Sequence, residues 1–248
     1  HEIKKKKKIE RIFGNLVSEN VLKQLVNKPH RLNLKSSVQK VTVMSCNIYN
    51  NLKLSEEIPP EKYVELINKV FNTIEKIIFD YNGTINRFVG NSVLVYWGYP
   101  IHARKDAENA IRAALEIQQK IDEYNTSFNE INFDEYDEQN FDEQKARKDS
   151  INVKIAINTG DALIGQIGSS SVSDFTVMGD TVDAIERIKD IAEEFQKDII
   201  VTENTLDQLD ENIPATYLGQ MRLKNSDTKI KIFELKLPSD NSSNETEE

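Results

Sequence analysis

The stretch from Thr84 to Gly98 reads TINRFVGNSVLVYWG and decides the fold predicted for this chain. Two runs rich in β-branched and aromatic residues flank Gly90-Asn91, a pair that lets two strands reverse direction through a two-residue loop. The sequence therefore predicts a β-hairpin at the centre of a sheet, with Asn91 at its tip. The side chains expected to point inward are Phe88, Val89, Val93, Leu94 and Val95.

The composition is that of an ordinary globular protein. The 248 residues are 38% hydrophobic and 29% charged, which suits one large domain or two small ones. A net charge of −9 disfavours nucleic acid as a partner, because such binding needs a basic surface. The single cysteine, Cys46, excludes an internal disulfide and is typical of a reducing compartment. No apolar run reaches the length of about 18 residues that a membrane-spanning helix needs.

The first 39 residues predict a basic, helical linker ahead of the main domain. Apolar residues recur at helical spacing from Ile9 to Val26, with Ser18 as an N-cap inside this stretch, and a polar link from Lys28 to Gln39 follows. The chain starts at His1 rather than at Met, so we expect it to be part of a longer protein. The lysines Lys4–Lys8 fit either a solvated charge run or a basic stretch that follows a transmembrane segment outside this sequence.

Strand and helix patterns alternate from residue 40 to residue 237. Helices are predicted at Pro60–Tyr81 and Asp106–Tyr124, from Gly179-Asp180 onward, and over Glu203–Leu209. Besides the hairpin, strands are predicted at Lys40–Ile48, Ile151–Asn158, Ala162–Gly168, Phe175–Met178 and Asp198–Thr202, and twice within Met221–Leu237. Thr159-Gly160-Asp161 is expected to be a turn. This order predicts an α/β sandwich in which a mostly antiparallel sheet packs helices on one face.

Two acidic segments depart from this pattern. Residues 122–150 hold ten acidic and three basic residues, which is typical of a mobile surface insertion or of a regulatory contact segment. Residues 238–248 are polar and acidic, and we expect them to be disordered.

Two motifs resemble the class III adenylate/guanylate cyclase catalytic domain. The hairpin segment from Arg87 to Asn91, RFVGN, is similar to the family pattern K-F-I-G-D. The segment from Asp174 to Asp183, DFTVMGDTVD, is followed by Arg187 and is similar to D-Y-T-V-I-G-D-T-V-N-x-x-x-R. The resemblance covers about Val41 to Leu237. It implies the ferredoxin-like nucleotidyl cyclase fold, an α/β fold with a mostly antiparallel central sheet and packed helices.

In this family two aspartates hold the Mg²⁺ or Mn²⁺ ions that activate the ribose hydroxyl and neutralise phosphate charge. The resemblance places them at Asn47 and Asn91, so both carboxylates are amides here. An amide keeps one carbonyl oxygen but lacks the charge that holds such an ion against water, and we expect no metal at these positions. Ile48 and Tyr49 stand in the turn that contacts the nucleotide phosphates in the family, but this turn lacks the family's glycine.

The resemblance assigns the other nucleotide contacts to a second group of residues. Arg87 and Thr176 match the positions that read the purine base, and Arg187 matches the arginine that stabilises the transferred phosphate. Asp183 replaces the asparagine that orients the ribose, and it precedes Arg187 by one helical turn, which allows the two to pair. Lys224 is a weaker match to a lysine that contacts phosphate.

We therefore expect a degenerate cyclase-homology domain that is inactive or severely impaired. The resemblance implies a signalling or regulatory dimerisation module on the cytoplasmic side of a larger membrane receptor, and a head-to-tail homodimer. One alternative is an active adenylate or guanylate cyclase that converts ATP or GTP to cyclic nucleotide and pyrophosphate, through unusual metal ligation or a partner subunit. The other is a sensor that binds ATP or GTP without turnover.

Overall fold

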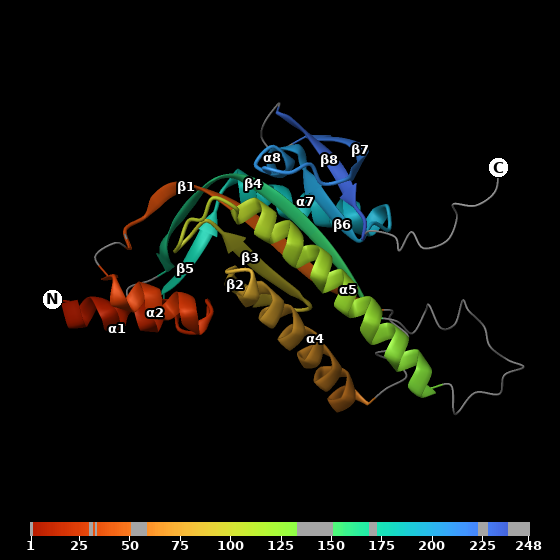
Figure 1. Cartoon of the computed structure of the whole chain (residues 1–248), viewed down its shortest axis with the longest axis horizontal. Coiled ribbons are helices and arrows are strands. Elements are labelled where there is room, and N and C mark those ends of the chain that lie inside the picture. The colour runs from red at the N-terminus through yellow and green to blue at the C-terminus, as the bar shows by residue number, and fades with distance from the viewer. Residues whose placement is uncertain are drawn as a thin grey trace, which may run out of the picture.

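The computed structural model describes residues 2–29, 32, 34–50, 59–132, 151–168, 173–222 and 228–237 (Figure 1). Its helices are α1 (Glu2–Phe13), α2 (Glu19–Asn27), α4 (Pro60–Asp80), α5 (Asp106–Asn132), α7 (Asp180–Glu194) and α8 (Glu203–Leu206). Its strands are β1 (Ser37–Asn50), β2 (Thr84–Val89), β3 (Ser92–Trp97), β4 (Ile151–Gly168), β5 (Ser173–Met178), β6 (Ile199–Thr202), β7 (Ala215–Arg222) and β8 (Lys229–Leu235).

The strands form one sheet in the order β2-β3-β1-β4-β6-β8-β7, with β5 paired to β4 outside this path. The pairing of β4 with β6 is parallel, and the other pairings of the described strands are antiparallel. The long strands β1 and β4 lie at the centre and pair along the whole of β1. The predicted α/β class with a mostly antiparallel central sheet is confirmed.

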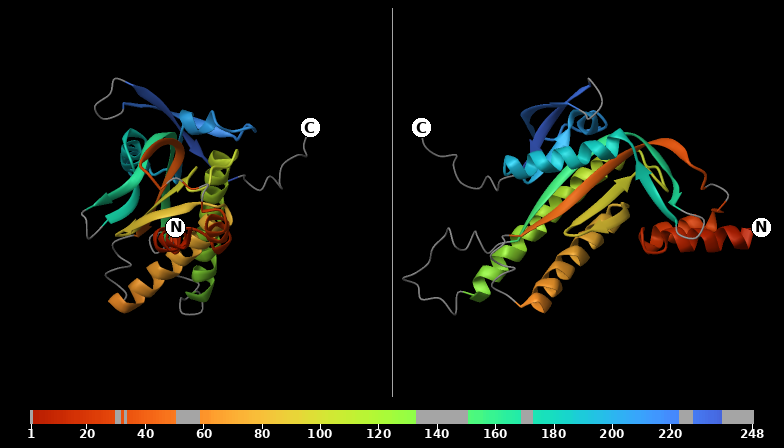
Figure 2. Two further views of the ribbon diagram at one scale, coloured as in Figure 1. Left: turned by 90° about the vertical axis from the view of Figure 1, so that its left-hand side faces the viewer. Right: turned by 180° about the vertical axis from the view of Figure 1, so that it is seen from behind.

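Helices cover both faces of this sheet, because successive side chains of β1 point to opposite sides. Met44, Cys46 and Ile48 pack in a core cluster with α4 and α5. Val41 and Val43 pack in a second cluster with side chains of α1, α2 and α7. Figures 1 and 2 show α5 and α7 on opposite sides of the central strands. The expectation of helices on one face is therefore wrong, since central strands that are apolar on both faces need cover on both.

The hairpin turn is where the sequence predicted it, but the hairpin is not at the centre of the sheet. Val89 pairs with Ser92 across the loop, and Gly90 has a φ of 60°, which favours glycine. Strand β2 is an edge strand, with β3 on one side. Phe88 and Val89 are accordingly 46% and 58% exposed, although Val93, Leu94 and Val95 of β3 are buried as expected.

The predicted turn at Thr159-Gly160-Asp161 is absent, because β4 runs through it without a break. Thr159 and Gly160 pair in register with Thr42 and Val41 of β1. Gly160 has a different role from the one expected of a turn residue. A Cβ atom at this position would lie 2.6 Å from Oγ1 of Thr181, so the glycine lets the first turn of α7 approach the strand.

The N-terminal helices belong to the same core as the sheet. Ile9 and Phe13 of α1 are fully buried, and they share a cluster with side chains of the sheet. Ser18 caps α2 as predicted, because its Oγ accepts from the Val21 N–H at 3.3 Å. The basic run Lys4–Lys8 is part of α1, which begins before the predicted start at Ile9.

Other boundaries shift by a few residues. Helix α5 continues to Asn132, so the first part of the predicted acidic insertion is helical. Residues 133–150, the tail 238–248 and the predicted loop at Asn225 lie outside the described residues. Strand β7 begins at Ala215 rather than at Met221. Within the described ranges, none of the helices combines the length and the apolar character that crossing a membrane requires.

Candidate functional site

Asn47 lies near the end of β1, is 4% exposed, and has both ends of its amide engaged. Its Nδ2 donates to Oε1 of Glu193 on α7 at 3.0 Å, and its Oδ1 accepts from the Ser92 hydroxyl at 2.7 Å. Ser92 begins β3 and is the register partner of Asn47. Because the ionised carboxylate of Glu193 can only accept hydrogen bonds, it fixes the amide with its nitrogen toward α7.

Asn91 at the hairpin tip is tied to the end of β1 through Ile48. Its Nδ2 donates to the Ile48 carbonyl oxygen at 2.7 Å. In return, the Ile48 N–H donates to the Asn91 carbonyl oxygen at 2.8 Å. The carbonyl acceptor also fixes the orientation of this amide. The structure therefore brings Asn47, Ile48 and Asn91 together, as the predicted site requires.

The residues present do not fit a pair of divalent cations. Mg²⁺ and Mn²⁺ are held by oxygen ligands, mainly carboxylates, whereas both asparagines direct N–H groups at acceptors. Glu193 contacts Asn47 but is already engaged by that donor. Within the part of the chain that the structure describes, no three His, Cys, Asp or Glu side chains gather closely enough to hold an ion.

Tyr49 is half-buried and faces the carboxylate of Glu193. Burial raises the pKa of Tyr49, a hydrogen bond to Glu193 and the negative charge of that residue raise it further, and Lys189 acts in the opposite direction. The hydroxyl is thus a neutral donor at physiological pH. The chain that follows the predicted turn at Ile48 and Tyr49, from residue 51 to residue 58, lies outside the described residues.

Asn86, which precedes Arg87 on β2, forms a hydrogen bond with Thr176 on β5. The Asn86 Nδ2 donates to Oγ1 of Thr176 at 3.3 Å, and the Asn86 Oδ1 is buried without a hydrogen-bond donor among the described residues. Sequence reasoning missed Asn86, because the register of β2 shifts between Ile85 and Arg87, and such a bulge redirects a side chain. Arg87 itself is exposed and forms no ion pair with the described residues.

Asp183 and Arg187 project from α7 into solvent, where both side chains are exposed. No ion pair joins them to each other or to other residues in the described ranges, so the pair that their spacing allows is not formed. Solvent exposure explains this, since exposed ion pairs gain little free energy. Lys224 lies outside the described residues, and its phosphate contact stays a prediction.

Ser92 and Glu193 are the other two residues of the site that sequence reasoning missed. Ser92 could have been found from the antiparallel pairing of β1 with β3, which places it opposite Asn47. No local pattern marks Glu193, because only the packing of α7 across β1 brings it to Asn47.

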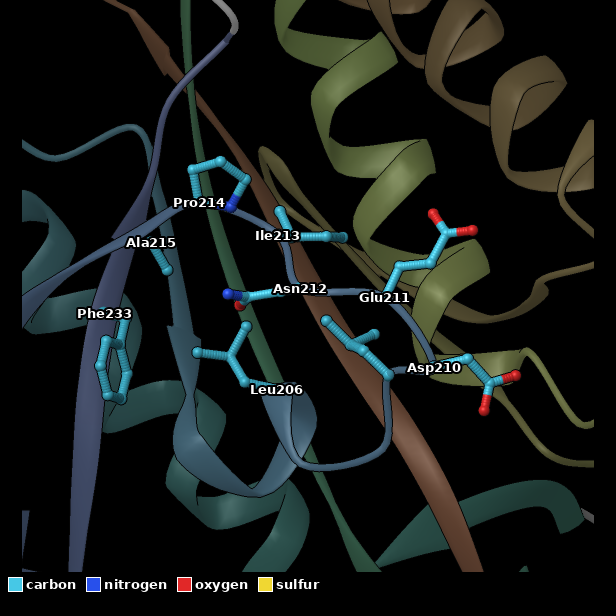
Figure 3. A pocket seen from close by; sticks show the side chains of 9 residues that line it. Leu206, Asp210, Glu211, Asn212, Ile213, Pro214, Ala215 and Phe233 are labelled. Atoms are coloured by element: carbon cyan, nitrogen blue, oxygen red, sulfur yellow. The ribbon is translucent and has the colours of Figure 1, made fainter.

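A cavity of about 480 Å³ lies elsewhere, between α8 and the β7–β8 hairpin (Figure 3). Its apolar wall includes Leu206, Ile213 and Phe233, and Asp210 and Glu211 lie at its side. None of the residues that the family pattern assigns to nucleotide or metal lines this cavity.

Comparison with known proteins identifies the family. Residues 34–236 match the family described as the adenylate and guanylate cyclase catalytic domain. Because this match covers most of the chain, the chain belongs to that family. The resemblance seen in the hairpin and in the segment around Gly179 is thereby confirmed.

Two curated relatives are similar to this chain over most of its length. Adenylate cyclase 1 of Rhizobium meliloti (strain 1021) is 23% identical over 223 residues, which is 90% of this chain and 31% of that protein. The adenylate cyclase of Anabaena cylindrica is 24% identical over 206 residues, or 81% of this chain and 38% of that protein. The chain therefore spans about a third of the length of these relatives.

Solved structures agree with the fold. The adenylyl cyclase CyaB from P. aeruginosa superposes with a TM-score of 0.68 at 23% identity, covering 85% of this chain and 100% of that one. The guanylyl cyclase Cya2 gives a TM-score of 0.66 at 21% identity and covers 84% of this chain and 97% of that one. The predicted nucleotidyl cyclase fold is confirmed.

Proposed function

We propose that this chain is a cyclase-homology domain without cyclase activity, which acts as a signalling or regulatory dimerisation module of a larger membrane receptor. One observation carries the proposal: both positions where the family places metal-binding carboxylates hold asparagines whose amide nitrogens face acceptors. Without anionic ligands at Asn47 and Asn91, no metal would activate the ribose hydroxyl or neutralise the triphosphate.

The packing of the N-terminal helices supports a role in transmitting a signal. Phe13 of α1 contacts Phe175 of β5 with ring centroids 5.4 Å apart. The Ile85 N–H of β2 donates to the carbonyl oxygen of Leu16, in the turn after α1, at 2.8 Å. Phe175 is adjacent to Thr176, and Ile85 precedes Arg87 by two residues. A displacement of α1 would therefore move β2 and β5, the strands that carry Arg87 and Thr176. The family pattern assigns these two residues to recognition of the base.

Two further features support a position on the cytoplasmic side of a membrane. The basic run Lys4–Lys8 lies on α1, and a basic segment is attracted to the anionic surface of the inner leaflet. The thiol of Cys46 is free and buried, which suits a reducing compartment.

A nucleotide sensor is the second candidate function. It is favoured by two arginines whose guanidinium groups are exposed and unpaired among the described residues. Arg87 and Arg187 are both exposed and have no carboxylate partner among the described residues. Their guanidinium groups are therefore available to phosphate or to a base edge. Such binding needs no carboxylate at position 47 or 91.

Turnover assays test the main proposal. Wild-type protein is incubated with ATP and with GTP, each with Mg²⁺ and with Mn²⁺, beside an active cyclase as a positive control. We expect no cyclic nucleotide above the blank, and clear turnover would overturn the proposal in favour of an active cyclase. Calorimetry with the same nucleotides separates the two candidates, because a sensor binds them and loses affinity in Arg87→Ala and Arg187→Ala.

A further inference from the structure

We propose that Glu193 of α7 selects an amide at position 47, so that a hydrogen-bonded lock takes the place of a metal ion in holding the hairpin tip, β1 and α7 together. This polar lock consists of Asn47, Ile48, Asn91, Ser92 and Glu193. This inference rests on the proposed loss of metal binding. Its test measures the stability of the fold, whereas the test of the proposed function measures turnover.

The chemistry of the partners requires an amide at position 47. Asn47 is buried and must offer a donor to Glu193 on one side and an acceptor to Ser92 on the other. An amide of this size does both, whereas an ionised carboxylate only accepts. An aspartate would place a second carboxylate about as close to Glu193 as the present 3.0 Å contact, with the Ser92 hydroxyl as its donor. Two like charges at that distance, one of them buried, are unfavourable.

The charged neighbours of Asn47 do not compensate for such a change. Lys154 is the register partner of Asn47 on β4 and its side chain is 6% exposed, but its Nζ pairs with Asp198 at 2.7 Å. Lys189, one turn before Glu193 on α7, pairs with Glu186 at 2.9 Å. Both cations form their ion pairs with other carboxylates, although the charge of Lys189 also acts on Glu193. Glu193 accepts hydrogen bonds from Asn47 and from the Tyr49 hydroxyl, and Asn47 is the buried donor of the two.

Asn91 forms the second part of the polar lock, and its position also requires a hydrogen-bond donor. Asn91 donates to the Ile48 carbonyl oxygen at 2.7 Å, and an aspartate there would face that oxygen with another acceptor. A cation between them would be needed to hold the tip in place. With amides at both positions, the tip is held against β1 and α7 by hydrogen bonds alone. The folded domain should therefore be indifferent to divalent cations.

A double-mutant cycle in thermal unfolding, in buffer with EDTA, tests the lock. Asn47→Asp should lower the unfolding midpoint by about 4 to 10 °C, the shift expected when a buried hydrogen bond is replaced by charge repulsion in a domain of this size. Glu193→Gln should change the midpoint little, because the Gln oxygen still accepts from Asn47. The combined Asn47→Asp/Glu193→Gln variant should recover most of the loss, because the Gln amide donates to the new carboxylate. Asn72→Asp, at an exposed position on α4, is the control and should leave the midpoint unchanged.

Two results would overturn the lock: an Asn47→Asp midpoint equal to that of the wild type, or a loss that Glu193→Gln fails to reduce. If Asn47→Asp is insoluble, soluble expression of the combined variant supports the lock, and insolubility of both contradicts it. Millimolar Mg²⁺ provides a second readout. It should raise the midpoint of Asn47→Asp and leave the wild type unchanged, and a rise of several degrees in the wild type would refute a metal-free lock.

Discussion

At the scale of single residues, an amide in place of a carboxylate hardly changes the shape of a side chain but reverses what it can contact. Asn47 and Asn91 each donate a hydrogen bond to an oxygen atom that a carboxylate would repel. The two substitutions therefore do more than remove metal ligands, because they let the same backbone positions form direct contacts. Asp183 adds a negative charge on the surface from which Arg187 projects.

Restoring the carboxylates should separate metal binding from turnover. We expect Asn47→Asp/Asn91→Asp to regain Mn²⁺ binding with little cyclic nucleotide formed, because Asp183 still places a negative charge where the family orients the ribose. The triple variant with Asp183→Asn should form more product than the double variant, since groups that act as one catalytic unit do not contribute independently. Product is measured for wild type, double and triple variants at equal concentration. A triple variant that binds Mn²⁺ but forms no product would place the defect in the turn after Tyr49.

At the scale of elements, the start of α5 shows how a buried charge is stabilised. The carboxylate of Glu108 is 6% exposed and lies 2.6 Å from Arg112 and 3.1 Å from Lys105. Hydrogen bonding from Lys105, helped by Arg112, outweighs burial and lowers the pKa of Glu108 below its ordinary value of 4.5. The ionised form is therefore favoured in the folded state.

The pH dependence of stability should report this group. Because the folded pKa is lowered, the contribution of Glu108 is fully present above pH 4.5 and is lost as the pH falls through the folded value. Glu108→Gln removes that part of the acid sensitivity. Urea unfolding at pH 7 and at pH 3.5 should show a smaller difference for Glu108→Gln than for the wild type, and equal differences would contradict this role.

Helix α1 should be essential to the fold rather than an appendage. Phe13 is fully buried against Tyr99 and Phe175, so Phe13→Ala should cost about 3 to 5 kcal/mol in the free energy of unfolding. Ile3, on the same helix but 72% exposed, is the matched control, and Ile3→Ala should cost less than about 0.5 kcal/mol. Urea unfolding compares the two, and similar losses would indicate that α1 does not pack as described.

Local patterns predicted the elements better than their positions in the sheet. The apolar stripe of α4 and the Gly90-Asn91 turn depend on neighbouring residues, so both were predicted correctly. The edge position of β2 depends on the order of strands that are distant in sequence, which is why the exposure of Phe88 was missed. The sequence predicts a turn at Gly160 because local pattern does not reveal the close approach of Thr181, a tertiary contact that requires a glycine there.

Local sequence patterns also predicted only part of the candidate site. The family resemblance predicts one site that includes Asn47 and Asn91, and it assigns Arg87 and Thr176 together to recognition of the base. It did not predict Glu193 or Asn86, since one depends on helix packing and the other on a bulge.

At the scale of the whole molecule, exposed apolar residues favour self-association. Val38 and Leu163 are register partners on β1 and β4 and are 67% and 40% exposed, and Ile167 further along β4 is 42% exposed. Exposed apolar residues that gather on one surface often mark interaction sites.

We therefore expect a weak or moderate homodimer in which Gly90-Asn91 of one protomer approaches Arg187 of its partner. Sedimentation velocity over a range of concentrations should show a dimer that Leu163→Asp weakens. Val64→Asp, which changes an apolar residue on α4 that is 55% exposed, should leave association unchanged. A strictly monomeric wild type at high concentration would count against the head-to-tail assembly.

The central claim is that Asn47 and Asn91 no longer hold metal, and anomalous scattering from crystals grown with Mn²⁺ and ATP or GTP tests it most directly. Mn²⁺ scatters strongly enough to be located without reference to the surrounding model of the protein. We predict no anomalous peak between the two asparagine side chains, whose amide nitrogens should still contact Glu193 and Ile48. A clear peak coordinated by both Asn47 and Asn91 would contradict the account.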